Sequence, residues 1–177
     1  LLHGQFDFPL YWSILETVGR HEAGLDKLAG ILTATADFHA GTLMSSFIGN
    51  HDVARFISHA AGDISDLWGN DAKNQAWTNP PGQPMEEAPY LRMQQAIAVI
   101  AGGPWIPTLY YGDEIGLAGS GDPDNRRMMT FEDLNPHQIA LQDFVSKALK
   151  ARLGSEALRR GDMTILEATL DTLVFHR

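Results

Sequence analysis

Two short apolar runs, residues 42–48 and 104–111, constrain this fold most, because each leads directly into polar residues. Their apolar, hydroxyl-bearing and aromatic composition is typical of buried strands. Segments with helical periodicity separate and follow them, at residues 88–101 and 136–149. Strands that alternate with helices form a parallel sheet with the helices packed outside it. The sequence therefore predicts an α/β fold.

The remaining segments predict three further helices, a long loop and a C-terminal hairpin. Further helices are expected at residues 10–18, 24–36 and 53–60, after a strand end at residues 1–8. Residues 62–87 have no apolar period and predict a long loop, which is usually functional or mobile. Residues 163–168 and 173–176 alternate and predict a hairpin, which we expect to begin a separate all-β domain. So few parallel strands cannot close a sheet, which is therefore open or completed by other strands.

Composition narrows the classes of function. The chain has 177 residues, 44% hydrophobic and 20% charged, enough for a folded domain with a sizeable core. A net charge of -9 argues against nucleic acid and anionic membranes as partners. The absence of cysteine excludes disulfides, thiolate metal sites and a cysteine nucleophile. No apolar run is long enough for a membrane span. The first residue is not Met, so we expect the chain to derive from something longer.

The first strand leads into Asn50, His51 and Asp52. Asp52 can stabilise positive charge or exchange a proton, His51 can donate to substrate oxygens, and Asn50 can orient either neighbour. The alternative is structural, with an Asx turn or with Asp52 capping a helix that starts at Val53. A metal site is disfavoured, because no second ligand lies at a suitable spacing.

The second strand ends in Tyr110 and Tyr111, followed by Gly112, Asp113 and Glu114. The glycine permits a turn directly after the strand. Glu114 either reaches the site or lies in a buried salt bridge, and we favour the structural role.

The loop at residues 119–127 (GSGDPDNRR) is rich in glycine, yet it lacks the patterns of a phosphate-binding loop or an EF-hand. Asp122 and Arg126 could clamp vicinal hydroxyls, since together they supply acceptors and donors. A surface salt bridge is the plain alternative. Trp68 and Trp77 lie in the predicted long loop and are candidate stacking platforms, whereas Trp105 is expected in the core.

Three segments resemble one family. Residues 47–52 (FIGNHD), with Arg55 and Phe56, resemble the fourth signature region of the α-amylase family of glycoside hydrolases. Residues 103–117 (GPWIPTLYYGDEIGL) are similar to that family's strand-8 segment. Residues 121–127 resemble the Gly-x-Asp-Pro-x-x-Arg loop of its neopullulanase, cyclomaltodextrinase and oligo-1,6-glucosidase-like members.

The resemblance implies that residues 1–153 are the C-terminal half of a (β/α)₈ barrel, about strands 6 to 8, and that residues 154–177 begin a β-sandwich domain. It also implies retaining cleavage of α-glucosidic bonds in starch-like or maltooligosaccharide substrates. In that family Asp52 would be the carboxylate that stabilises the transition state.

The same resemblance assigns the binding groups. His51 and Asn50 would bind or orient the same sugar, and Asp122 and Arg126 would contact the next sugar on the non-reducing side.

The sequence departs from the family pattern in one decisive respect. The family's nucleophile aspartate and general acid glutamate follow strands 4 and 5, which precede everything present here. We therefore expect the 177-residue chain to be inactive alone and to need the missing N-terminal half of the barrel. It is expected to hold no cofactor itself; a Ca²⁺ site, in members that have one, comes from that missing half.

Other hypotheses stay open. A transglycosylase of the same family, such as a trehalose synthase or glucanotransferase, would share these motifs. A non-catalytic sugar-binding or remnant module could keep Asp122, Arg126 and the tryptophans without a nucleophile. An unrelated α/β hydrolase or metal enzyme using His51 and Asp52 is disfavoured, because the Gly-x-Ser-x-Gly elbow and ligand clusters are missing.

Overall fold

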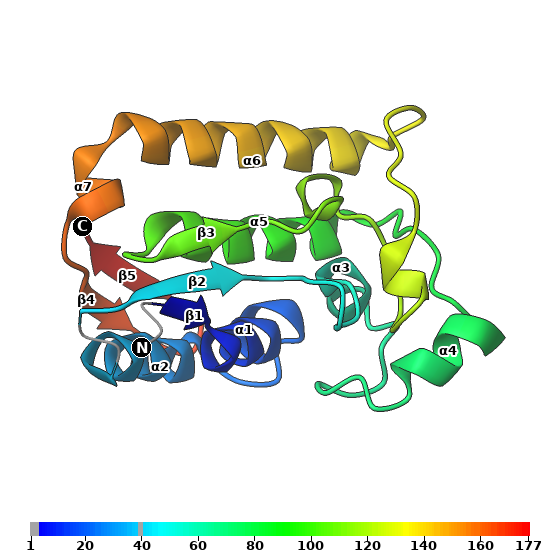
Figure 1. The fold of residues 1–177 in the computed structure, drawn as a ribbon, viewed down its shortest axis with the longest axis horizontal. Helices are drawn as coiled ribbons and strands as arrows, with labels where there is room; N and C mark the ends of the chain where they lie inside the picture. Colours follow the sequence, from blue (N-terminus) through cyan, green and yellow to red (C-terminus); the bar gives the residue numbers. More distant parts are fainter. Residues whose placement is uncertain (1–3, 39–40) are drawn as a thin grey trace.

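The computed structural model describes residues 4–38 and 41–177 and contains a parallel three-stranded sheet (Figure 1). The strands are β1 (Gly4–Phe6), β2 (Leu43–Phe47) and β3 (Ile106–Thr108), in the order β1-β2-β3. Every pairing is parallel, with Gly4 opposite Leu43 and Ser45 opposite Ile106. The predicted parallel α/β arrangement is therefore confirmed.

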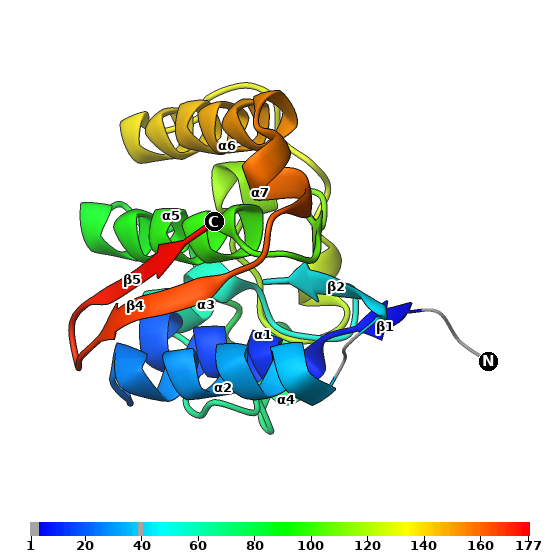
Figure 2. The same cartoon turned by 90° about the vertical axis from the view of Figure 1, so that its left-hand side faces the viewer.

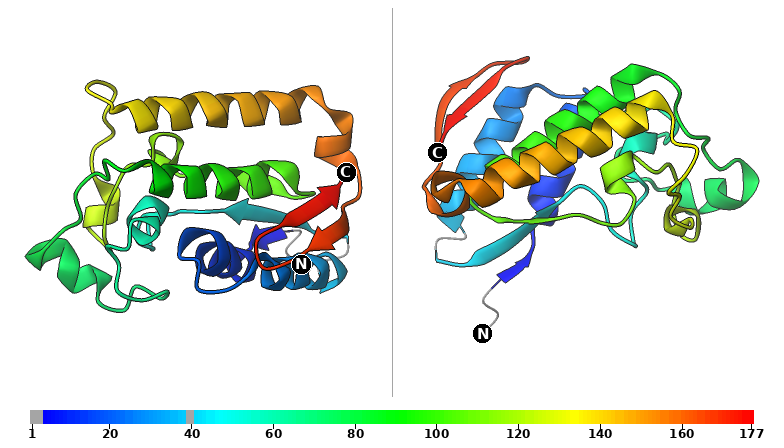
Figure 3. Two further views of the ribbon diagram at one scale, coloured as in Figure 1. Left: turned by 180° about the vertical axis from the view of Figure 1, so that it is seen from behind. Right: turned by 90° about the horizontal axis from the view of Figure 1, so that it is seen from above.

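The longer helices follow the strands and lie on one side of the sheet (Figures 2 and 3). They are α1 (Phe8–Ile14), which continues as a π-helical turn (Leu15–Gly19), α2 (Leu25–Phe38), α3 (Phe56–Ala60), α4 (Ala72–Thr78), α5 (Glu87–Gly102), α6 (Pro136–Gly154) and α7 (Glu156–Arg160). Single 3₁₀ turns at Asp113–Ile115 and Asp124–Arg126 shape the loops after β3.

Local sequence signals determine where two of these helices begin. The Asp7 carboxylate accepts a hydrogen bond from the Leu10 amide at 3.0 Å, which caps α1 directly after β1. Asn135 and Gln138 form a reciprocal capping box at the start of α6.

The core lies between the sheet and the helices. Tyr11 stacks on Phe47 with ring centroids 5.0 Å apart, so α1 and β2 pack closely. Trp105 is buried, as expected from the sequence. The other fully buried apolar side chains come from every layer and include Leu10, Ile14, Leu28, Leu32, Ile48, Ile57, Tyr90, Ile97 and Leu141.

Several predicted boundaries were wrong. The predicted loop at residues 62–87 contains α4, which buries only Ala72 and therefore has no apolar period. The short helix after β2 begins at Phe56 and not at residue 53. The strand predicted over residues 104–111 is reduced to Ile106–Thr108.

The predicted hairpin is present as β4 (Thr164–Ala168) and β5 (Leu173–His176), which pair antiparallel with an irregularity between Ile165 and Glu167. Its turn caps the start of α2: the amides of Leu25 and Asp26 donate to the carbonyls of Leu170 and Thr169, each at 2.9 Å. The hairpin lies at one end of the molecule, and α3 and α4 lie at the other (Figures 1 and 3).

Candidate functional site

Three loops meet beyond the carboxyl ends of β2 and β3, at residues 48–55, 109–118 and 119–127. Arg55 joins them from a buried position, with 1% of its surface exposed. Its Nε donates to the Asn125 carbonyl at 2.8 Å, which fixes the third loop. The sequence alone assigned no chemistry to this arginine.

The same guanidinium holds the loop after β3. Its Nη1 donates to the Tyr111 carbonyl at 2.6 Å and lies 3.5 Å from Oδ1 of Asp113. The guanidinium carbon lies 4.4 Å from the centre of the Tyr110 ring, a cation–π distance. Arg55 thus sits at the centre of the three loops, and its geometry is imposed by all of them.

Asp113 is the acidic partner of this arginine. Burial raises the pKa of Asp113 to about 7, against the lowering effects of Arg55 and of the hydrogen bond from the Tyr110 amide. A Cβ atom on Gly49 would lie 2.9 Å from the Asp113 carboxylate, so the loop after β2 approaches this close only because residue 49 is glycine. Glu114, the residue considered for a salt bridge from the sequence, forms none within the described part of the chain; its neighbour Asp113 forms the pair.

Asn50, His51 and Asp52 directly follow Gly49, the residue that contacts this buried pair. The Asn50 side-chain oxygen accepts from the Asp52 amide at 2.7 Å, forming the Asx turn that the sequence allowed. Nε2 of His51 lies 3.5 Å from Oδ2 of Asp52, and both side chains are about two-thirds exposed, at 63% and 67%. Asp52 does not cap a helix, because α3 starts at Phe56.

The loop that carries Asp122 and Arg126 contacts this triplet. Nε of Arg126 lies 3.2 Å from Oδ1 of Asp122 and donates to the His51 carbonyl at 3.2 Å. Asn125, which is fully buried, donates to the carbonyls of His51 and Val53 at 3.0 and 2.9 Å. The structure therefore joins the two groups of predicted site residues, through hydrogen bonds from the side chains of Asn125 and Arg126 to backbone carbonyls of the loop after β2.

A second ion pair anchors the same loop. Arg127 pairs with Asp124 at 2.6 Å and donates to the Pro81 carbonyl at 2.7 Å. The Asp124 carboxylate also accepts from the Ser120 amide at 2.7 Å. Asp122 and Arg126 therefore project from a loop whose conformation is fixed by bonds within it and by a contact with Pro81.

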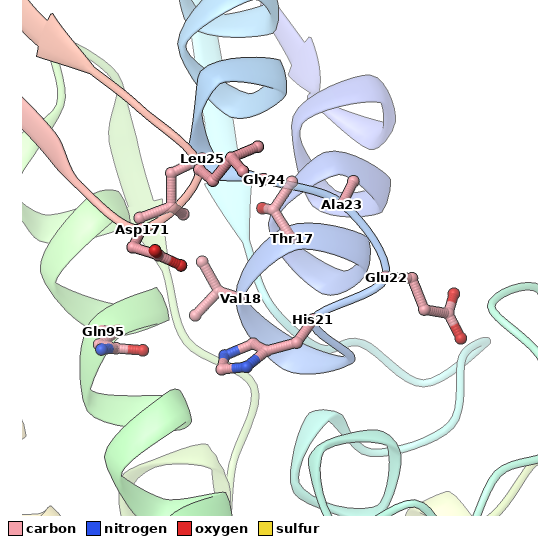
Figure 4. Close-up of a pocket in the computed structure, with 10 residues that line it drawn as sticks. Thr17, Val18, His21, Glu22, Ala23, Gly24, Leu25, Gln95 and Asp171 are labelled. Atoms are coloured by element: carbon pink, nitrogen blue, oxygen red, sulfur yellow. The ribbon is translucent and has the colours of Figure 1, made fainter.

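A polar cavity of 390 Å³ lies elsewhere, between the π-helical turn, α5 and the turn of the hairpin (Figure 4). His21, Gln95 and Asp171 line it. Burial and Arg92 lower the pKa of His21, against the opposite effect of Asp171. The cavity contains none of the residues of the three loops, so it is separate from the site that the sequence predicts.

The described residues offer no cluster of three or more side chains that could hold a metal ion. Within the same residues, no helix is both long and apolar enough to cross a membrane.

A parallel α/β structure with carboxylates, an imidazole and a guanidinium in loops at one end of its strands has the architecture of an α/β enzyme. Comparison with known proteins gives the family. No family model matches the chain. The amylopullulanase of Thermoanaerobacter thermohydrosulfuricus is 31% identical over 134 residues, 75% of this chain and 8% of that protein. The cyclomaltodextrinase of Thermoanaerobacter pseudethanolicus is 24% identical over 180 residues, 98% of this chain and 27% of that protein.

Among solved structures, the α-amylase of Geobacillus thermoleovorans, complexed with acarbose, superposes with a TM-score of 0.75 and 30% identity. The match covers 97% of this chain and 33% of that one. The chain thus belongs to the α-amylase family of glycoside hydrolases, family 13, and aligns with part of the α-amylase catalytic domain. It spans a third or less of the length of these relatives.

Proposed function

We propose that this chain supplies the sugar-binding and transition-state-stabilising side of a retaining glycosidase that acts on α-glucosidic bonds of starch-like or maltooligosaccharide substrates. One observation carries the proposal: Arg126 lies 3.2 Å from both Asp122 and the His51 carbonyl, so the two groups of candidate residues form one surface. The names of the relatives, amylopullulanase and cyclomaltodextrinase, agree with this class of substrate.

Each residue has a role that suits its chemistry. The exposed Asp52 carboxylate would stabilise the positive charge that develops on the sugar ring, and His51 would donate to a hydroxyl of the same sugar. Asn50 would hold the turn that presents both. Asp122 and Arg126 would bind the adjoining sugar, the carboxylate accepting from hydroxyls and the guanidinium donating to them.

In this proposal β1, β2 and β3 are strands 6 to 8 of a (β/α)₈ barrel within residues 1–153, and residues 154–177 begin a β-sandwich domain. The position of the helices on one side of the sheet supports it, because a barrel keeps its helices outside. The nucleophile and the general acid would come from the remaining strands, as would any Ca²⁺ site. Retaining cleavage needs those two carboxylates about 5 Å apart.

Binding tests the proposal without requiring turnover. We expect the purified chain to bind maltotetraose in isothermal titration calorimetry. Asp52→Ala and Asp122→Ala should each weaken binding by about tenfold or more, because a hydrogen bond to a charged group contributes roughly 1.5–3 kcal/mol. Asp143→Ala is the matched control, since that exposed carboxylate pairs with Lys147 on α6, away from the three loops.

Turnover gives the second half of the test. The chain alone should release no reducing sugar from starch or maltotetraose, because it lacks the nucleophile and general acid. Measurable turnover that Asp52→Ala abolishes would contradict the proposed division of roles. Binding that is unchanged in both the Asp52→Ala and Asp122→Ala variants would contradict the proposed site itself.

A further inference from the structure

We propose that Trp68, which rests on Trp12, is a stacking platform that extends the sugar-binding surface along an α-glucan chain. The choice of ligand rests on the function proposed above. The platform is defined as these two indole rings. It lies outside the set of residues that the motifs single out.

The platform exposes a large apolar surface. Trp68 is 60% exposed, and its ring centroid lies 4.7 Å from that of Trp12, with the planes at 56°. Trp12 in turn contacts Tyr11 with ring centroids 4.7 Å apart, which connects the platform to the core. An aromatic surface that packs against the core on one side and is open to solvent on the other is suited to bind a flat apolar face, such as the C–H face of a pyranose.

The loop that carries Trp68 is held in place. The Asp66 carboxylate accepts from the Trp68 amide at 2.8 Å, and from the Asn70 amide and side chain at 3.2 and 3.1 Å. Arg20 donates to the Ile64 carbonyl at 2.8 Å on the other side of the turn. These bonds fix the backbone around Trp68, and the contact with Trp12 orients its ring, so little conformational entropy is lost when a ligand binds.

The segment that follows Trp68 contacts the loop that carries Asp122. The Ala72 carbonyl, at the start of α4, accepts from the Gly121 amide at 3.1 Å and the Ser120 hydroxyl at 2.8 Å. Gly121 directly precedes Asp122. Figure 1 shows α4 at the same end of the molecule as α3 and the end of β2. A glucan chain that leaves the Asp122 position therefore has an aromatic surface on the adjoining segment.

Size and charge favour a sugar over other occupants. Because Trp68 is 60% exposed and Trp12 is partly buried, the two rings supply less than the roughly 300–500 Å² of two whole tryptophans, whereas a stable protein interface buries about 800 Å² on each partner. Asp66 and Asp71 flank Trp68 in the sequence, which disfavours nucleic acids and other anionic ligands. The exposed Asp71 carboxylate is suited to accept hydrogen bonds from the hydroxyls of a neutral oligosaccharide.

The test titrates the chain with maltoheptaose and follows the indole N–H signals by NMR; four tryptophans give four signals. We expect the Trp68 and Trp12 signals to shift and the signal of the buried Trp105 to stay. Trp68→Ala should raise Kd by about three- to tenfold, the range of an aromatic contact. Trp68→Phe, which keeps a flat ring, should recover part of that loss. Trp77, the other platform candidate of the sequence, is 76% exposed on α4 and has no aromatic partner among the described residues, so Trp77→Ala is the matched control and should change Kd less than twofold.

The outcomes separate this inference from the proposed function. If Asp52→Ala weakens binding while Trp68→Ala leaves Kd unchanged and the Trp68 signal does not move, the platform is overturned and the proposed site stands. If Trp68→Ala weakens binding and Asp52→Ala does not, the platform stands and the proposed site fails. Equal losses in Trp68→Ala and Trp77→Ala would overturn the assignment to Trp68.

Discussion

Two buried titratable residues, Asp113 and His59, give this chain opposite dependences on pH. Asp113 lies behind the candidate site and is 1% exposed, and His59 on α3 is 3% exposed. Burial raises the pKa of Asp113 from 3.8 to about 7. Burial, with Arg20, lowers the pKa of His59 from 6.5 to about 4. Each residue is therefore kept closer to its neutral form in the folded state than in the unfolded chain.

The signs follow from proton binding. Between pH 4 and pH 7 the folded state holds more protons at Asp113, so this residue lowers the free energy of unfolding as pH rises. Between pH 4 and pH 6.5 the unfolded state holds more protons at His59, so that residue raises the free energy of unfolding as pH rises. The two contributions oppose each other in the same window.

We predict that single substitutions reveal each contribution. Relative to the wild type, Asp113→Asn should make stability rise more steeply from pH 4.5 to 6.5, and His59→Gln should make it fall, each by up to about 1.4 kcal/mol per pH unit. Urea unfolding followed by circular dichroism at several pH values measures both slopes. Variant curves that run parallel to the wild-type curve would contradict these assignments.

At single residues, the sequence drew attention to exposed polar side chains, whose roles stay predictions, and missed the buried residues that support them. Asn50, His51 and Asp52 stand out because three polar residues directly follow an apolar strand. The pairing of Arg55 with Asp113 could not be predicted in the same way, since it joins residues 58 positions apart and depends on how two loops pack. Only the structure reveals that the Asp113 carboxylate lies close to Gly49, because the spacing of these residues in the sequence does not encode that contact.

Among the elements, those with a strong apolar period were predicted well, and those held by loop contacts were not. Helices α5 and α6 were expected because they bury a continuous stripe. Helix α4 buries only Ala72, and its carbonyl instead receives hydrogen bonds from Gly121 and Ser120. Its position is set by contacts distant in sequence, which periodicity cannot detect.

The contact between the hairpin and α2 leads to a prediction about two glycines. A methyl group on Gly24 would lie 2.7 Å from Leu170 Cδ2 and 3.0 Å from its Cα, whereas one on Gly30 would have nothing within 4 Å. Gly24→Ala should therefore destabilise the chain by about 1–3 kcal/mol, through overpacking of the turn that caps α2. Gly30→Ala, in the exposed middle of the same helix, should stabilise it by about 0.5–1 kcal/mol.

Urea unfolding compares the two variants, and hydrogen exchange locates the effect. In the wild type the Leu25 and Asp26 amides should be protected, because they donate to the hairpin turn. Gly24→Ala should reduce that protection and Gly30→Ala should not. A loss of stability in Gly24→Ala with full protection of both amides would place its cause elsewhere.

At the scale of the whole molecule, no strand among the described residues pairs with the outer edge of β1 or β3, which agrees with the prediction that these strands cannot close a sheet by themselves. Apolar side chains are exposed on these strands and on β2: Phe6 at 55%, Leu43 at 62% and Ile106 at 47%. Beside β3 lies an open groove of 500 Å³, lined in part by Leu109, Val145 and Leu149. Unpaired strand edges with apolar neighbours favour association with further strands.

We therefore predict that the isolated chain self-associates, and that one charge at the β3 edge reduces this. Ile106→Lys places an ammonium group on the edge strand, where natural proteins often use lysine to block pairing. Sedimentation velocity should show association that grows with concentration in the wild type and is weaker in Ile106→Lys. Leu153→Lys is the matched control, because Leu153 on α6 is 72% exposed and lies outside the sheet. Equal suppression by both substitutions would show that added charge, and not the strand edge, controls association.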